Sequence, residues 1–221
     1  MTALAHEAPE MTETPEMPET SPEPHLDEVL WQAWKAMELP EGFHAEIIEG
    51  FIEVSPTGRY AHGQTANRLR RALDTFLADG EYAAHQDINI VDGRQVWIPD
   101  VFLAPEDAED HVTDDGIGIK ASAVALIAEV VSPGHDSTHR DRVRKRRAYA
   151  RAGIPVYVLV DDHDGHGTVT VLTSPDPDEG VYAAEVRVPY GTEITLPEGP
   201  AKGFTITESL TGPLRPAAQR D

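Results

Sequence analysis

"ALIAEVVSP", residues 125–133, is the stretch that decides the fold of this 221-residue chain. Six of its nine residues are apolar, and a short apolar run that ends at a proline is typical of a strand buried on both faces. Glu129 interrupts this run. Because an unpaired carboxylate is costly to bury, Glu129 predicts a raised pKa, a neighbouring cation or a bound metal ion in the core.

A second apolar stretch, "VWIPDVFLAP" (residues 96–105), has the same peculiarity, with Asp100 directly after Pro99. If the two strands pair with the right stagger, Asp100 and Glu129 meet at one end of the sheet. Two carboxylates that close repel each other, so either one is protonated or a cation holds both. A hard divalent ion suits such oxygen ligands, and we expect Mg²⁺, with Mn²⁺ as a substitute. The alternative is that Asp100 only caps a strand end and Glu129 pairs with an arginine.

The rest of the chain extends this pattern in both directions. Apolar periodicity and turn residues predict these elements: helices over 26–37 and 60–79, two short strands around Glu49-Gly50, a hairpin of 81–91 and 95–104 joined near Asp92-Gly93, a strand over 122–131, a helix from about 136 to Arg151 that stops at Gly153, a strand over 154–161, and a closing antiparallel pair at 168–173 and 181–188. The core order of helix, three strands, helix and strand predicts an α/β protein, with a mixed β-sheet flanked by helices.

Composition sets the class of protein. The chain has no cysteine, no long apolar run and no basic start followed by an apolar segment, so we expect a soluble cytoplasmic protein without a membrane anchor. We expect residues 1–25 to form a disordered, acidic, Pro/Glu-rich tail, 26–210 the folded domain, and 211–221 a C-terminal tail.

Charge is unevenly distributed. The formal net charge is −21, which by itself disfavours a polyanionic partner. However, basic residues bunch in "RYAHGQTANRLRR" (59–71) and "HRDRVRKRRAYAR" (139–151). We therefore expect Arg142 and Arg146 on one helix, and Arg68 and Arg71 on the other, to contact a nucleic-acid backbone.

Several stretches together resemble a known family. They are "AEIIEGFIEVSP", "HGQTANRLRRAL", "IPD", "AEVVSP" and "RDRVRKRRAYARAGIPVYVLVD", within about residues 40–210. This ordered set is similar to the Uma-two family of restriction endonuclease-like proteins, in the PD-(D/E)XK nuclease superfamily. The resemblance implies a restriction-endonuclease-like fold with the core order α-β-β-β-α-β, in which Pro99-Asp100 is the PD and Glu129 the (D/E).

One position departs from the superfamily pattern. The lysine expected two residues after the acid falls at Val131, and the resemblance implies that Lys145 on the following helix replaces it. Asp141, Lys145 and Tyr149 have i, i+4, i+8 spacing and so share a helix face, which packs back toward the strand of Glu129. The competing interpretation is that Lys145 is one more exposed base.

Three further groups are candidates for the site. Glu46 opens a stretch that matches a family pattern, and an additional acid completes the metal site in related nucleases. His62, near a helix start, is a candidate phosphate ligand or base, or else a surface histidine. The backbone carbonyl of Val130 is a candidate third metal ligand after Asp100 and Glu129.

These residues predict a Mg²⁺-dependent endonuclease that hydrolyses phosphodiester bonds, with DNA favoured over RNA through the resemblance alone. Two alternatives stay open: a catalytically inactive nuclease-like module that binds nucleic acid, and a metal-dependent hydrolase of another substrate. Many nucleases of this class are dimers, so a homodimer is also open. His135 and His139 have spacing compatible with zinc, although a helix start explains them equally well. No Ser-His-Asp arrangement is apparent.

Overall fold

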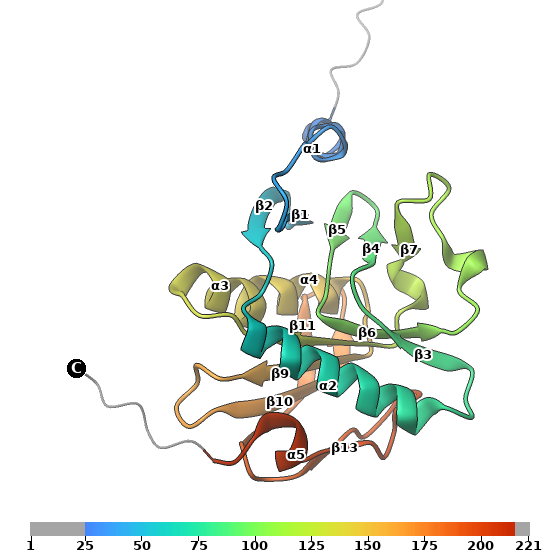
Figure 1. Cartoon of the computed structure of the whole chain (residues 1–221). Helices are drawn as coiled ribbons and strands as arrows, with labels where there is room; N and C mark the ends of the chain where they lie inside the picture. Colours follow the sequence, from blue (N-terminus) through green and yellow to red (C-terminus); the bar gives the residue numbers. More distant parts are fainter. Residues whose placement is uncertain (1–24, 215–221) are drawn as a thin grey trace, which may run out of the picture.

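The strand of Glu129, β8 (Leu126–Val130), lies inside a six-stranded mixed sheet of order β11-β10-β9-β8-β6-β3 (Figure 1). This is a computed structural model, and it describes residues 25–214. The other strands of this sheet are β3 (Tyr82–His85), β6 (Val101–Pro105), β9 (Val156–Asp161), β10 (Thr168–Asp176) and β11 (Val181–Pro189). Within this sheet, β8 and β9 are the one described pair of strands that run in parallel. They can do so because the helical segment between them carries the chain back across the sheet.

Side-chain alternation along β8 explains where Glu129 points. Leu126, Ala128 and Val130 belong to the apolar cluster beneath α2 (Tyr60–Leu77). Ile127 belongs to the cluster on the opposite face, beneath α4 (Arg146–Arg151). Because successive side chains alternate between faces, Glu129 shares the α4 face.

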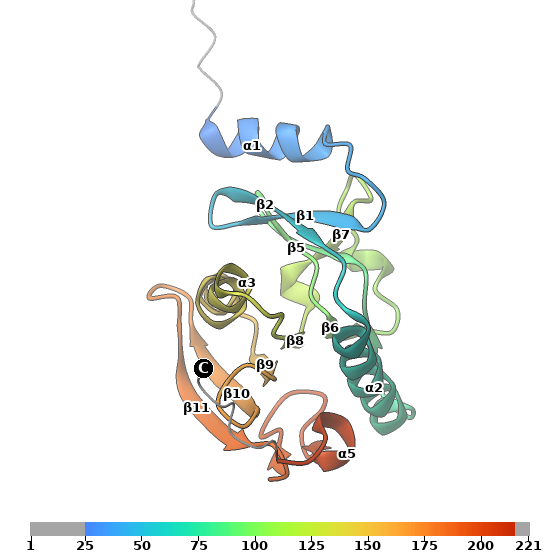
Figure 2. The same ribbon diagram turned by 60° about the vertical axis from the view of Figure 1, so that its left-hand side comes forward.

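Helices cover both faces of this sheet. On one face lies α2, which buries Leu69, Leu73 and Leu77, together with the C-terminal segment β12 (Ile194–Thr195), β13 (Thr205–Ile206) and α5 (Glu208–Thr211). The helical segment on the other face lies between β10–β11 and the hairpin of β1 (Phe43–Ile48) and β2 (Phe51–Pro56) (Figure 2). No helix within residues 25–214 is long and apolar enough to span a membrane.

That helical segment is not the uniform α-helix predicted from the sequence. It consists of α3 (His135–His139), a π-helical stretch η3 (Arg140–Lys145) and α4, and it ends before Gly153, whose φ is +72°. The wider π-helical turns carry Asp141 and Lys145, which are both buried. Such turns occur frequently at functional sites.

A second sheet, of order β2-β1-β5-β4-β7, packs above the α4 face. Its strands are β1 (Phe43–Ile48), β2 (Phe51–Pro56), β4 (Asn89–Asp92), β5 (Gln95–Trp97) and β7 (Gly118–Lys120). The short 3₁₀ helices η1 (Glu109–His111) and η2 (Ala121–Ala123) flank β7. Helix α1 (Leu26–Lys35) covers this sheet through Trp31, which contacts Ile47 and Val96.

The predicted hairpin of 81–91 and 95–104 is wrong as a single unit. Its turn is present, with Asp92 paired to Gln95 and Gly93 at φ +58°. Each arm, however, is broken partway, so β4 and β5 pair in the second sheet while β3 and β6 pair in the first. Asp87, at φ +59°, interrupts one arm, and Pro99, which has no N–H for a ladder, interrupts the other.

The predicted tails lie largely outside the described residues, which exclude 1–24 and 215–221. The described part of the C-terminal tail includes Thr211, the last residue of α5. The restriction-endonuclease-like core order is present as α2, β3, β6, β8, the helical segment from α3 to α4, and β9.

Candidate active site

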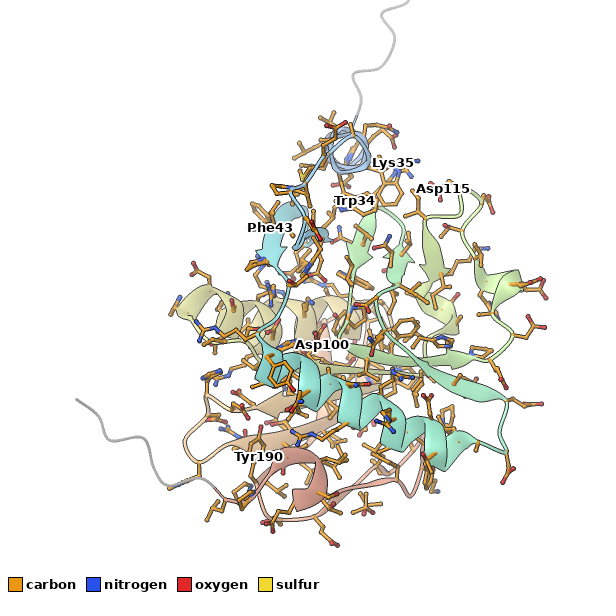
Figure 3. The ribbon with its side chains drawn as sticks, in the orientation of Figure 1. Trp34, Lys35, Phe43, Asp100, Asp115 and Tyr190 are labelled. Atoms are coloured by element: carbon orange, nitrogen blue, oxygen red, sulfur yellow. The ribbon has the colours of Figure 1, made fainter. Side chains whose placement is uncertain are left out.

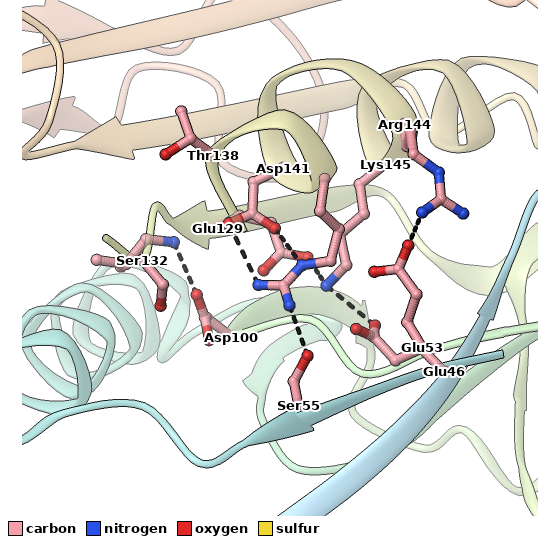
Figure 4. Close-up of polar contacts among 12 residues, drawn as sticks. Glu46, Glu53, Ser55, Asp100, Glu129, Ser132, Thr138, Asp141, Arg144 and Lys145 are labelled. Carbon is pink, nitrogen blue, oxygen red and sulfur yellow. Dashed lines mark hydrogen bonds and ion pairs between the residues drawn. The ribbon is translucent and has the colours of Figure 1, made fainter. Parts of the chain in front are cut away.

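Glu129 on β8 and Asp100, which directly precedes β6, line the same cavity, of about 450 Å³. Strands β6 and β8 are antiparallel with Val101 opposite Ala128, so the next position along the register sets Asp100 opposite Glu129. Asp100 Oδ2 accepts a hydrogen bond from the Val130 N–H at 2.7 Å (Figure 4). The two acids predicted to converge are therefore brought to one end of the sheet.

Lys145 reaches this pair from η3. Its Nζ lies 2.9 Å from Glu129 Oε1 and 2.9 Å from Glu46 Oε1, and the residue is only 2% exposed. Burial alone would lower the pKa of Lys145, but the charges of Glu129 and Glu46 raise it above its usual value. The structure thus contradicts an exposed Lys145 and confirms that it lies beside Glu129.

Val131 cannot supply the positive charge that the family resemblance led us to expect at its position. Its side chain is buried in the same apolar cluster as Ile127 and Tyr149. The ammonium group comes instead from the facing helical segment, above Glu129. A lysine from that side satisfies the carboxylates and leaves the apolar packing at position 131 intact.

Glu46 and Tyr149 complete the polar contacts around Lys145. Glu46, on β1, accepts a hydrogen bond from the Ile98 N–H at 2.8 Å. Tyr149 is fully buried, and its hydroxyl donates to Glu129 Oε1 at 2.6 Å. Lys145 and Tyr149 therefore hold the same oxygen of Glu129, and Oε2 is not part of either contact. The helical spacing had placed Tyr149 on the face of Lys145, but had assigned it no role.

Glu129 is difficult to ionise in this environment. Burial raises its pKa to about 8, and the charges of Asp100, Asp141 and Glu46 act in the same direction, while Lys145 opposes them. The pKa of Asp141 is also raised by burial, against the charges of Lys145 and a neighbouring arginine. Burial is thus the main reason that these two carboxyl groups resist ionisation.

That arginine is Arg140. Its Nε donates to Asp141 Oδ1 at 2.8 Å, and its Nη1 donates to Ser55 Oγ at 2.7 Å (Figure 4). With Arg140 and Lys145 charged, ionising Glu46, Asp100, Glu129 and Asp141 would leave a formal charge of −2, or −1 when His62 is also protonated. A divalent cation would offset this negative charge.

The donor atoms also fit a hard divalent ion. Asp100 and Glu129 offer carboxylate oxygens. The Val130 carbonyl faces the same edge of β8 as the Val130 N–H, which points at Asp100. Within residues 25–214 no three His, Asp or Glu side chains are grouped so as to hold a metal ion alone. Mg²⁺ does not need such a group, since it is commonly bound by one or two carboxylates, waters and substrate phosphates.

Asp100 lies beside α2 (Figure 3), and His62, in the N-terminal part of that helix, contacts it. Its Nε2 lies 2.8 Å from Asp100 Oδ1, and its Nδ1 lies 3.3 Å from Ser132 Oγ. Burial would lower the pKa of His62, but the hydrogen bond and charge of Asp100 raise it. A Cβ at Gly58 would lie 2.4 Å from the imidazole ring, so glycine at this position leaves room for the ring.

His62 thus joins a Ser-His-Asp arrangement that is not apparent in the sequence. Ser132, His62 and Asp100 lie far apart in the chain and meet only through folding. The ring is reversed relative to a serine hydrolase, with the acid at Nε2 and the serine at Nδ1. The only local signal for Ser132 is its position directly after the apolar run of Glu129.

The basic run at 139–151 is neutralised within the fold. The ion pairs of its remaining arginines are Arg142 with Asp161 at 2.6 Å, Arg144 with Glu53, Arg146 with Glu185 at 2.9 Å, and Arg147 and Arg151 with Glu49. Arg142 and Arg146, which were predicted to contact nucleic acid, thus each already pair with a carboxylate of the fold. Arg68 and Arg71 are exposed and make no ion pair with any described residue.

The zinc alternative gains no support. His135 and His139 are both exposed, and their rings are stacked with centroids 6.4 Å apart. No third ligand joins them among the described residues.

Comparison with known proteins agrees with this architecture. The model of the Uma2 family, described as "Putative restriction endonuclease", matches residues 31–209, which is most of the chain. This chain belongs to the Uma2 family. A crystal structure from Anabaena variabilis, described as a "putative nuclease belonging to DUF820", is similar to the Uma2 chain, with a TM-score of 0.62 and 17% identity. The match covers 84% of this chain and 96% of that one, and it supports the restriction-endonuclease-like fold. No curated protein matches the sequence.

Proposed function

We propose that this Uma2 protein is a Mg²⁺-dependent endonuclease that hydrolyses phosphodiester bonds in nucleic acid, with Mn²⁺ able to substitute. The observation that carries the proposal is the buried cluster in which Asp100 and Glu129 share a cavity with Lys145. A divalent ion would balance these carboxylates when they are ionised, and the same residues line a cavity of about 450 Å³. Membership of a family described as restriction endonuclease gives the reaction type.

Asp100, Glu129 and the Val130 carbonyl would hold the ion. When bound there, a divalent ion supplies polarisation of the phosphate and activation of a water. Lys145 has three N–H donors, and two of them are directed at Glu129 and Glu46. The third is available to a water or phosphate oxygen in the cavity, where a buried ammonium stabilises developing negative charge.

His62 acts at the entrance of the same cavity. It touches Asp100, and so it orients that carboxylate and can meet a phosphate from the α2 side. Glu46 acts through Lys145, because its carboxylate fixes the ammonium on the side away from Glu129. DNA is favoured over RNA only by the family description.

The test is a cleavage assay with single- and double-stranded DNA and RNA, in Mg²⁺, Mn²⁺ or EDTA. We expect cleavage that requires a divalent ion and is lost in Asp100→Asn and Glu129→Gln, with weaker ion binding measured by calorimetry. Glu193→Gln, which removes an exposed acid remote from the cavity, is the matched control. Wild-type cleavage and ion affinity in Asp100→Asn would show that the site assignment is wrong.

The two alternatives give different results in the same assay. An inactive nucleic-acid-binding module would bind the oligonucleotides and leave all of them intact. A hydrolase of another substrate would bind the ion through Asp100 and Glu129 but neither bind nor cut the panel.

We further propose a cytoplasmic location, which the absence of cysteine supports. A homodimer stays a prediction from the superfamily, and sedimentation at several protein concentrations would test it.

A further inference from the structure

The outer face of α2 is the basic surface that the fold leaves free. From residue 54 to residue 73 the chain contains no acid, although the whole protein carries a formal charge of −21. Arg59, Arg68 and Arg71 are exposed in this stretch and make no ion pair with any described residue. The arginines of the other basic run are all paired. This face is therefore where a polyanion meets unneutralised cations.

An exposed aromatic ring lies at the end of this surface nearest the cavity. Tyr60, the first residue of α2, is 81% exposed. Gln64 Nε2 donates to its hydroxyl at 2.5 Å. Gly58, His62 and Gly63 line the cavity, so Tyr60 lies between residues of the cavity wall but faces outward. A tyrosine this exposed gains little from the core, and its ring is free to stack on another planar group.

Helical spacing joins these residues into one line. Tyr60, Gln64, Arg68 and Arg71 follow i, i+4, i+8, i+11, while His62, Ala66, Leu69 and Leu73 lie on the inner side. We infer that this line binds one unpaired strand of nucleic acid, with a base stacked on Tyr60 and the backbone along the arginines. The inference rests on the proposed function and specifies its substrate as single-stranded.

Two features favour a single strand over a duplex. A base can stack on Tyr60 only if it is free of its own helix, and aromatic rings interleaved with cations are the usual platform for single strands. A duplex presents phosphates on both sides of a groove, whereas the unpaired cations of α2 form one line. The second basic helical segment, which could grip another strand, is occupied by its ion pairs.

The length of the line sets the size of the bound segment. Eleven residues separate Tyr60 from Arg71, or about 17 Å at ~1.5 Å per residue. At a stacked rise of ~3.4 Å, this corresponds to roughly five nucleotides. Beyond the far end of α2 lies a pocket lined by acids, namely Glu81, Glu106, Asp107 and Glu109, which would repel further phosphates.

The experiment is fluorescence anisotropy on the full chain in EDTA, where binding is separated from cleavage. The probes are a labelled single-stranded DNA, the same strand in a duplex, and a series of single strands of increasing length. We expect tighter binding of the single strand and an affinity that stops rising at about five nucleotides. Tyr60→Ala should weaken single-strand binding by about 5- to 150-fold, while Tyr60→Phe retains it.

The salt dependence of binding tests the contribution of the arginines. Replacing Arg68 and Arg71 with Gln removes two phosphate contacts, so the slope of log affinity against log salt should decrease in magnitude by about 1.4. Lys120→Gln, which removes an exposed charge on β7, is the control and should leave the slope unchanged. All these side chains are exposed, so loss of the fold does not complicate the comparison.

Equal affinity for strand and duplex, or a Tyr60→Ala protein that binds like wild type, would overturn the inference. Failure of the proposed function looks different. If the protein binds single strands through Tyr60 but cleaves nothing in Mg²⁺ or Mn²⁺, the binding surface is supported and the nuclease activity is refuted. If it cleaves duplex DNA and Tyr60→Ala has no effect, the nuclease activity is supported and the binding surface is refuted.

Discussion

Lys145 is the residue on which the candidate site depends. It is the only lysine between Lys120 and Lys202, and folding brings it within 2.9 Å of two buried carboxylates. A cation at this point allows Glu46 and Glu129 to be buried close together. An arginine would not be equivalent, because its guanidinium group is planar and bulkier than the ammonium group of lysine.

We predict that Lys145→Met lowers the rate of cleavage by about a hundredfold or more, since a buried electrostatic stabiliser is lost. The measurement is single-turnover cleavage at saturating Mg²⁺. Lys120→Met is the control, because Lys120 is exposed on β7 and does not line the cavity. If Lys145→Met cleaves at the wild-type rate, the lysine has no part in the reaction.

Tyr149 fixes the orientation of Glu129. Its hydroxyl shares Oε1 with Lys145, which leaves Oε2 for the cavity side. We predict that Tyr149→Phe raises the Mg²⁺ concentration needed for half-maximal cleavage and leaves the rate at saturating Mg²⁺ less affected. The physical reason is that Glu129 loses one of the two donors that position it.

Tyr157→Phe is the matched control for this prediction. Tyr157 is equally buried and packs against Tyr149, but its hydroxyl donates to the Asp141 carbonyl at 2.8 Å and not to a carboxylate. Each substitution should lower the free energy of unfolding by about 1 kcal/mol for the lost hydrogen bond. Only Tyr149→Phe should change the Mg²⁺ dependence, and the same change in both variants would contradict the positioning role.

At the scale of elements, the β1–β2 hairpin is held to α4 by charge. Glu49 and Gly50 form its turn, with φ of +52° and +74°. The Glu49 carboxylate contacts Arg147 and Arg151, and the hydrogen bond from Arg147 holds its pKa below the usual range. Because Glu46 lies on the same hairpin, this contact also keeps Glu46 beside Lys145.

We predict that Glu49→Gln lowers the free energy of unfolding by about 1 kcal/mol, because several charge-assisted contacts are weakened together. Urea unfolding at low salt and at about 1 M salt would measure it, and the effect should shrink as salt screens the charges. Glu185→Gln is the control, since Glu185 makes a single exposed pair with Arg146 and should change stability little. Equal effects of the two substitutions would argue against a special role for the turn.

At the scale of the whole molecule, the stability of the main sheet should depend on pH through His85. This residue lies on β3, its ring stacks on Phe102, and its Nε2 is buried without a hydrogen-bond partner among the described residues. Burial lowers the pKa of His85, with the charge of Asp74 opposing it. His85 therefore binds a proton less readily in the folded protein than in the unfolded chain.

Stability should therefore decrease as the pH falls. As pH falls below about 6.5, the unfolded state binds more protons at this position than the folded state, so the free energy of unfolding falls. We predict that His85→Phe, which keeps a stacking ring, removes this part of the decline between about pH 7.5 and 5.5. Thermal unfolding of both proteins across that range measures it. A variant whose stability falls as steeply as that of wild type would contradict the assignment.

The amino-acid sequence alone determined the elements whose signals are local. The apolar runs predict β8 and β9, the periodicity predicts α2, and the turns at Glu49-Gly50 and Asp92-Gly93 are found where expected. Asp100 and Glu129 also stand out in the sequence as acids within apolar stretches, and both line one cavity in the fold.

Only the tertiary structure decided which distant residues meet. His62 lies 38 positions from Asp100, and Arg147 lies 98 positions from Glu49. No local pattern encodes such contacts, so Ser132 beside His62, the division of the hairpin between two sheets and the neutralised basic run were not foreseen. Periodicity shows which face of an element is buried, but the partner of that face depends on how all the elements pack together.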